Sequence, residues 1–252
     1  MIKFFRKIRQ NLLMENKTGK YFKYAVGEII LVVIGILIAL SINNWNENRK
    51  NSIEEKAILE NLLENLKLSK IQSELLLSEE NQLKQNLVQI LGIDSNNKLN
   101  TKIISDSIFK NAVWDLQSDK PTFNAYNNLK STNKLSLIKN KNINEKFTEL
   151  EFRQNKLKDI LEDRLSVHQI RIDNILEKDI NFIPLVKSNV PNINIENESK
   201  NNYSQLLGIK RIRNLLGMKL SFTQDVIDFR KNLDTEIKEL INLIKKELNE
   251  KK

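Results

Sequence analysis

The feature that constrains this chain most is an apolar stretch from residue 24 to residue 42, YAVGEIILVVIGILIALSI. A helix of these 19 residues would reach roughly 28 Å at about 1.5 Å per residue, close to the hydrocarbon thickness of a bilayer. The ten Ile, Leu and Val residues between residues 29 and 40 favour insertion by roughly 3–6 kcal/mol, which outweighs a cost of at most about 3 kcal/mol for Glu28. The stretch is therefore predicted to be a transmembrane helix.

The charges around this stretch predict its orientation. The first 23 residues carry seven Lys or Arg residues and one acid. The positive-inside rule therefore places residues 1–23 in the cytoplasm and residues 43–252 outside it, with the helix in the inner membrane. Residues 1–16 have a basic amphipathic pattern, which predicts a short helix along the cytoplasmic leaflet. The predicted contacts to lipid headgroups are Lys3, Arg6, Lys7, Arg9, Lys20 and Lys23.

Three features of the apolar stretch allow alternative interpretations. Ala39 and Ser41 have the spacing of a signal-peptidase site, but the cationic leader and the apolar run are both long for a cleaved signal peptide. Glu28 can be an ion or proton site, although a carboxylate reaching the cytoplasmic headgroups is the favoured interpretation. Gly27, Gly35 and Ala39 share a helical face that would allow close packing against a second span. The residues assigned to membrane anchoring are Tyr24, Glu28, Gly35, Ala39 and Trp45, the aromatic pair lying at the two interfaces.

Composition predicts the class of the remaining chain. About 210 residues follow the stretch, enough for one substantial domain or two small ones. Six Gly and three Pro residues, with heavy use of Leu, Ile, Lys, Glu and Asn, favour long helices over strands. The absence of cysteine excludes disulfides, a thiol nucleophile and Cys-ligated metals. The predicted fold class is all-α, with one N-terminal transmembrane helix followed by an elongated antiparallel helical bundle or coiled-coil domain.

The formal net charge of +9 does not indicate a nucleic-acid-binding protein. From residue 24 onward there are 34 basic and 31 acidic residues, so the domain itself is nearly balanced. The excess positive charge lies in the segment predicted to face the cytoplasmic leaflet. We therefore expect the lipid bilayer as a partner, and no nucleic acid.

Apolar residues at helical spacing predict the elements of the domain. The first long helix has an apolar stripe that is interrupted at Ser69, Ser73 and Glu80. Asn142 is the predicted N-cap of the second long helix, with Glu145 completing a capping box. The five expected helices cover residues 47–91, 103–117, 121–130, 142–178 and 204–250, the third opened by Pro121. Residues 183–202 are expected to form a long polar loop.

Two stretches are similar to a known family. The first runs from MIKFFRKIR at residue 1 through GKYFKYAVGE at residues 19–28 to ALSINNWNE at residues 39–47. The second, TFNAYNNLKSTNKLSLIKN, covers residues 122–140. They resemble a family of uncharacterised single-span membrane proteins of Bacteroidota, a domain of unknown function. The resemblance implies a membrane-anchored helical protein and brings no catalytic residues. The family usually has a glycine near the position of Asn133.

The residues that carry chemistry give no enzyme signature. His168 is the one histidine of the sequence, which precludes His-rich metal sites and any catalytic triad built without it. It lies on an apolar stripe and is expected to be a core or boundary residue, with Asp163 or Asp173 in reach. Acidic residues are expected on solvated helix faces rather than in a metal or glycosidase site. The six glycines stand singly, without a phosphate-binding pattern. We expect no catalytic residue, metal or cofactor.

Three classes of function follow from these observations. The first is a structural or interaction module of the cell envelope that works through a protein partner or self-association. The second is a ligand-sensing module, for which Trp114, Phe123 and Tyr126 could line a pocket between helices, although aromatic residues at helix junctions usually close a core. Such a module would need a partner, because the 23 residues before the span are too few for a signalling domain. The third, an enzyme, is disfavoured.

Overall fold

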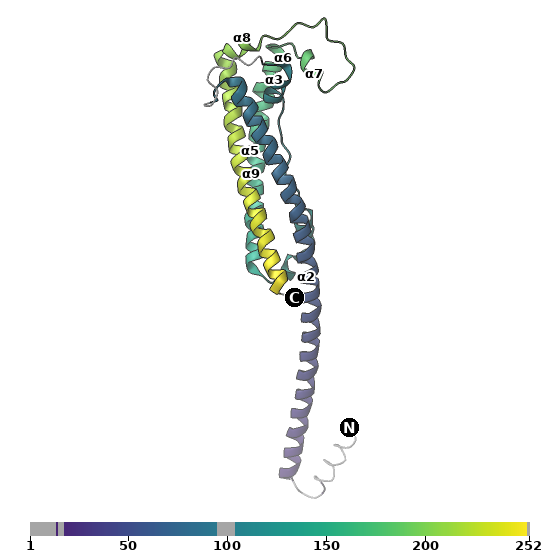
Figure 1. Cartoon of the computed structure of the whole chain (residues 1–252). Helices are drawn as coiled ribbons and strands as arrows, with labels where there is room; N and C mark the ends of the chain where they lie inside the picture. Colours follow the sequence, from purple (N-terminus) through teal and green to yellow (C-terminus); the bar gives the residue numbers. More distant parts are fainter. Residues whose placement is uncertain (1–13, 15–17, 95–103, 251–252) are drawn as a thin grey trace. The chain divides into compact units, whose positions relative to one another are not determined.

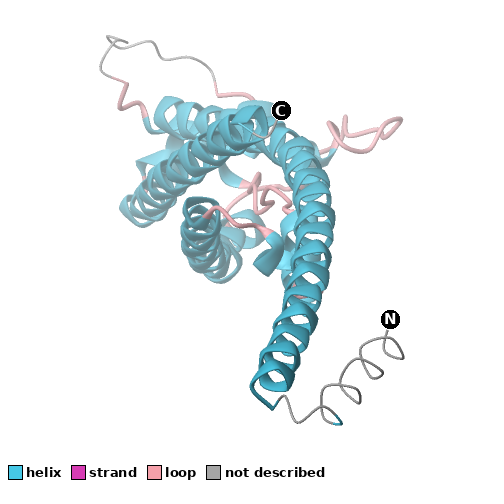
Figure 2. Ribbon diagram, turned by 90° about the horizontal axis from the view of Figure 1, so that it is seen from below, coloured by secondary structure: helices cyan, strands magenta, loops and turns pink. Residues whose placement is uncertain are grey.

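The computed structural model describes residues 14, 18–94 and 104–250. Throughout these residues the regular structure is helical and no strand occurs, which confirms the all-α prediction (Figure 2). The helix predicted over residues 1–16 lies outside the described residues, except for Met14. The chain divides into two compact units, Met1–Ala57 and Ile58–Lys252.

The described part of the first unit is the beginning of α2 (Thr18–Leu91). Its large apolar side chains from Ile29 to Ile42 each expose between 46% and 64% of their surface. The helix is long and apolar enough to cross a membrane, and none of its residues 25–42, which we call the apolar window, is buried. Apolar surface is less stable in water than in an apolar environment by about 25 cal/mol per Å². The exposed side chains of this stretch are therefore better suited to hydrocarbon than to water.

The second unit is built from the remainder of α2, from α5 (Lys141–Val167) and from α9 (Lys210–Glu250), which lie side by side (Figure 1). Asn140, before the start of α5, donates to Glu247 near the end of α9 at 2.5 Å. The carbonyl of Leu91, at the end of α2, accepts from Arg213 near the start of α9 at 3.0 Å. Helix α9 therefore runs antiparallel to both α2 and α5.

Two apolar clusters form the core of the second unit. The first contains residues 59–66 of α2, the interior face of α5 and the later part of α9, and the second contains residues 83–91 of α2 and the beginning of α9. Where one cluster gives way to the other, each long helix contributes buried polar side chains. We call this set the polar layer; it comprises Ser69, Ser73, Glu80, Arg164, His168, Lys219, Thr223 and Arg230.

Short helices complete the second unit. They are α3 (Asp106–Val113), α4 (Asn124–Ser131), the 3-10 helix η1 (Lys134–Leu137), the π-helix η2 (His168–Ile172), α6 (Asp173–Lys178), α7 (Ile183–Val186) and α8 (Tyr203–Gly208). Residues 114–123, between α3 and α4, form an irregular segment that we call the connector.

The two short predicted helices are shorter or displaced in the structure. Helix α3 covers only residues 106–113 of the predicted 103–117, of which residue 103 lies outside the described residues. The predicted start of the next helix at Pro121 is wrong, because α4 begins at Asn124. The backbone of Thr122 is held elsewhere: its N–H donates to Gln72 at 2.9 Å and its carbonyl accepts from Ser69 at 2.5 Å.

The two later long helices also differ in detail from the predictions. Asn140, not Asn142, is the N-cap of α5, because its side chain accepts from the backbone N–H of Asn142 at 3.0 Å. The predicted helix 142–178 is interrupted by η2, and the predicted helix 204–250 is divided at Ile209, whose backbone is extended. The preceding Gly208 has a low helix propensity, which favours the interruption at that point.

The turn after α4 has Asn133 near the position where the resembled family usually has a glycine. Asn133 adopts the left-handed conformation, with φ of 58°. Glycine takes this conformation without steric cost, and asparagine is among the few other residues that adopt it readily. Asn133 can therefore replace a glycine at this turn.

Candidate functional site

The anchor residues predicted from the sequence all lie in α2. Glu28 is partly buried, and Ala39 is exposed. A Cβ atom added at Gly35 would meet nothing within 4 Å, so that side of the helix is open. Trp45 exposes 66% of its surface, and the guanidinium of Arg49 lies 6.0 Å from its ring centroid. Tyr24 also belongs to α2.

The predicted headgroup contacts are described only in part. Lys20 and Lys23 belong to the first turns of α2, directly before the apolar window, and Lys23 is exposed. The other four, Lys3, Arg6, Lys7 and Arg9, lie outside the described residues.

The most unusual chemistry of the second unit is centred on Glu80, which is fully buried. Two nitrogens of the Arg164 guanidinium bind its two carboxylate oxygens at 2.6 and 2.7 Å, and Arg230 lies 3.4 Å from one of the same oxygens. Both arginines are at most 2% exposed. A bidentate charge-assisted pair of this kind offsets part of the desolvation cost of burying the three charges, and it links α2 to α5 and α9.

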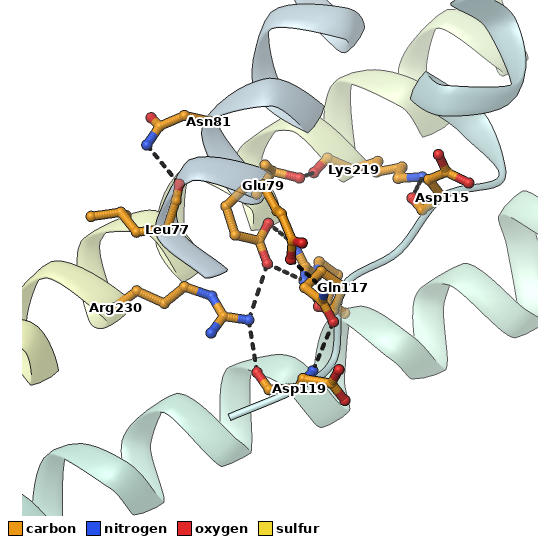
Figure 3. A network of polar contacts seen from close by, with 11 residues as sticks. Leu77, Glu79, Asn81, Asp115, Gln117, Asp119, Lys219 and Arg230 are labelled. Atoms are coloured by element: carbon orange, nitrogen blue, oxygen red, sulfur yellow. Dashed lines mark hydrogen bonds and ion pairs between the residues drawn. The ribbon is translucent and has the colours of Figure 1, made fainter. Parts of the chain in front are cut away.

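These two arginines and Lys219 hold the connector against the helices (Figure 3). The carbonyl of Gln117 accepts from Arg164, and the carbonyl of Asp119 accepts from Arg230 at 3.0 Å. Lys219 donates to the carbonyls of Val113 at 2.7 Å and Asp115 at 2.9 Å. The connector thus obtains from buried side chains the hydrogen bonds that regular structure would otherwise supply.

Lys219 is the most perturbed cation of the polar layer. Burial lowers its pKa to about 7, and the positive charge of Arg164 acts in the same direction. Carbonyl oxygens, rather than a carboxylate, accept its hydrogen bonds. In its hydrogen bonds the ammonium is therefore stabilised by carbonyl dipoles and not by a negative charge. Because this does not replace the hydration that is lost on burial, Lys219 releases its proton at a lower pH than a lysine in water does.

His168 lies in the polar layer, as a core or boundary residue, and begins the π-helix η2. Its Nε2 atom is 3.2 Å from the carboxylate of Asp173, whereas Nδ1 is buried without a hydrogen-bond partner. Burial lowers the pKa of His168 to about 4, with further contributions from Lys219 and Arg164. The imidazole is therefore neutral at neutral pH. Of the two carboxylates considered from the sequence, Asp173 is the one in contact.

The structure does not bring the three predicted aromatic residues into one pocket. Phe123 and Tyr126 belong to the first apolar cluster, where Tyr126 stacks on Phe147 at 4.5 Å. Trp114 packs instead against Phe182, with ring centroids 4.6 Å apart. Core packing at helix junctions was the simpler interpretation of the sequence, and it is the one that these contacts support.

An open depression does lie beside the connector. It has a volume of about 290 Å³ and is lined by residues 118–124, Asn127 and Gln154. Phe123 is the one predicted aromatic residue in this lining. Among the described residues, no group of three or more His, Asp or Glu side chains is placed to hold a metal ion.

Sequence reasoning missed the partners within the polar layer. Glu80 was recognised as an interruption of an apolar stripe, and other acids such as Glu74 and Glu162 do have exposed i,i+4 lysine partners as expected. Arg164, Lys219 and Arg230 also occupy positions on apolar stripes of their helices, which is the signal that would have identified them.

Comparison with known proteins gives one family. Residues 28–113, about a third of the chain, match a family of unknown function (DUF6090). The matched region contains all but the first three residues of the apolar window of α2, together with Glu80 and α3, and it ends before α5 and α9. No curated protein and no solved structure matches the chain.

Proposed function

We propose that this chain is a single-pass inner-membrane protein with a cytoplasmic N-terminus and an extracytoplasmic antiparallel helical bundle. The bundle would work by contact with another envelope protein or with a second copy, without catalysis and without nucleic acid. The match to a family of unknown function is consistent with an activity that remains to be assigned.

The observation that carries the proposal is the exposure of the apolar window in α2. Its side chains point outward around the helix and none of the window is covered by the rest of the chain. A helix that is apolar all round needs an apolar solvent or a covering partner. Because the window also matches the bilayer in length, lipid is the solvent that we assign to it.

The two ends of the window support this assignment. Lys20 and Lys23 precede it, in agreement with a cytoplasmic flank. At the other end, the exposed ring of Trp45 lies under the Arg49 guanidinium. An amphipathic ring beside a cation suits the membrane–water interface, where aromatic residues are enriched.

A second apolar face supports the interaction role. Leu68, Ile71 and Leu75 expose 60%, 63% and 60% of their surfaces, and their spacing of three and four residues puts them on one side of α2. These residues belong to the second unit, outside the proposed span. We propose this face as the first region to test for protein contact.

Reporter fusions test the topology. Alkaline phosphatase fused after residue 252 is expected to be active, and a fluorescent protein at the same place is expected to stay dark. The reverse pattern would overturn the orientation. A tag at each end of the chain distinguishes an anchor from a cleaved leader, because cleavage near Ala39 would separate the two tags.

Site-specific photo-crosslinking in intact cells tests the interaction. A photoreactive residue at Ile71 is expected to give a discrete adduct, whereas the same residue at Lys158, an exposed position on α5, serves as the matched control. An adduct twice the mass of the chain indicates self-association, and another mass indicates a different envelope protein. Equal labelling at both positions, or none at either, would contradict a role for this face.

A further inference from the structure

The connector is held by a regular pattern of contacts. The carbonyls of residue 113, the last of α3, and of connector residues 115, 117 and 119 accept hydrogen bonds from buried cations of α5 and α9. Figure 3 shows Lys219 reaching Asp115 and Arg230 reaching Asp119. Farther along, Ser69 and Gln72 of α2 hold the backbone of Thr122. The connector therefore depends on side chains of the polar layer.

The buried side chains around these contacts carry more positive than negative charge. Glu80 is the fully buried carboxylate between Arg164 and Arg230. Three other acids whose charge acts on these cations are more accessible to water: Glu79 on α2, Asp115 on the connector and Asp173 on α6. Lys219 and His168 add two further sites for positive charge, from α9 and η2. Buried donors already lack partners, including Nε of Arg164 and both Nε and Nη1 of Arg230.

Proton uptake at these sites acts against the closed arrangement. The pKa of His168 is lowered to about 4 and that of Lys219 to about 7, in both cases chiefly by burial. Once water reaches them, both groups return toward their ordinary pKa values of 6.5 and 10.5 and bind protons more tightly. Acid therefore favours whichever state exposes these two side chains.

We propose that the polar layer is an acid-sensitive latch, in which protonation of Lys219 and His168 beside Arg164 and Arg230 releases the connector while the two apolar clusters remain folded. The open state relieves repulsion among four cations that share one buried carboxylate. The buried members of the two apolar clusters are apolar side chains and two tyrosines, which are neutral in acid, so these members gain no charge as the pH falls.

Trp114 provides a direct probe, since it is the first residue of the connector and packs on Phe182. In the full chain, Trp45→Phe leaves Trp114 as the one tryptophan. Titrated in detergent from pH 9 to pH 3, a range that begins inside the Lys219 window and includes the His168 window, its fluorescence is expected to change at a higher pH than the helical circular dichroism signal. Hydrogen exchange, referred to the intrinsic exchange rate at each pH, should show a loss of protection of the backbone amides at 115–120 and 122 over the same range. Coincident fluorescence and helix transitions would overturn the proposal.

His168→Gln tests the source of the effect, because Gln does not titrate and can still donate to Asp173. The fluorescence midpoint is expected to move to lower pH by about half a unit or more. Lys130→Gln, which alters an exposed ion pair with Glu151, should leave the midpoint unchanged. Lys219→Gln gives an independent test, since an amide can donate to both carbonyls without charge. If neither polar-layer variant shifts the midpoint, the latch is excluded.

Discussion

Glu80 illustrates how one buried side chain can depend on its partners. It accepts from Arg164 in a bidentate pair and lies within 3.4 Å of Arg230. Glu80→Gln removes the charge but keeps the shape, and leaves two guanidiniums buried without a carboxylate. We expect a loss of about 3–5 kcal/mol in the free energy of unfolding, measured by urea titration with Trp114 fluorescence in a Trp45→Phe background.

Two controls separate the charge effect from packing. Glu151→Gln breaks the exposed pair with Lys130 and should lower the stability far less. Replacing the whole set, as in Glu80→Leu with Arg164→Met and Arg230→Met, should restore much of the stability, because no charge of this set then remains buried. If the triple variant is as unstable as Glu80→Gln, the three charged side chains together stabilise the folded chain. Their effect is then more than the cost of leaving one buried charge without its partner.

The lowered pKa of Lys219 predicts that the free energy of unfolding depends on pH above pH 7. Its pKa is about 7 in the folded chain, compared with 10.5 for a lysine exposed to water in the unfolded chain. The unfolded state therefore binds more protons between these values, and the free energy of unfolding must rise with pH across that window. We expect an increase of about 2 kcal/mol from pH 7 to pH 9, measured by urea titration. In Lys219→Met this increase should disappear; an unchanged slope would contradict the assignment.

The sequence reveals the positions of the polar layer better than its pairings. Ser69, Ser73 and Glu80 interrupt an apolar stripe, and the structure shows that all three are buried rather than misplaced. Periodicity identifies which side of a helix faces the core. It carries no information on the axial register between helices, so the pairing of Glu80 with Arg164, 84 residues away, needs the folded chain.

At the scale of elements, the turn between α4 and η1 depends on Asn133. The residue is exposed and holds a φ of 58°. Asn133→Ala should lower the free energy of unfolding by about 1–2 kcal/mol, because a β-carbon without a compensating polar side chain is disfavoured in this conformation. Asn133→Gly, the matched variant, should be close to neutral. Urea midpoints of the two variants check this, and equal values would argue against strain at the turn.

Helix type and extent were predicted best where the apolar pattern is long. The end of α2 at Leu91 agrees with the predicted helix 47–91, whereas α3 and α4 differ from their predicted ranges by several residues. The difference has a physical cause, since the connector residues between them bond to side chains of α2, α5 and α9. These tertiary contacts outweigh the local helix propensity of the connector residues, and they are not visible in the pattern of a single sequence.

For the whole molecule, the decisive property is the contrast between the two units. The second unit buries its apolar residues in two clusters. The first exposes a continuous run of Ile, Leu and Val along α2. This division is the one that the proposed membrane anchor requires, and the sequence already indicates it through one long apolar stretch with a single charge and a remainder of nearly balanced charge.

Charges placed in the apolar window test this division. Val33→Lys together with Leu37→Lys adds roughly 6–8 kcal/mol to the cost of insertion, more than the roughly 3–6 kcal/mol that the window supplies. The double variant should therefore leave the membrane fraction after carbonate extraction. Leu68→Lys with Leu75→Lys also adds two lysines at exposed positions on the same helix, outside the window, and should remain membrane-bound. If the window variant also remains in the membrane fraction, α2 is not the anchor, because no lipid-facing helix tolerates two such charges near its centre without a compensating partner.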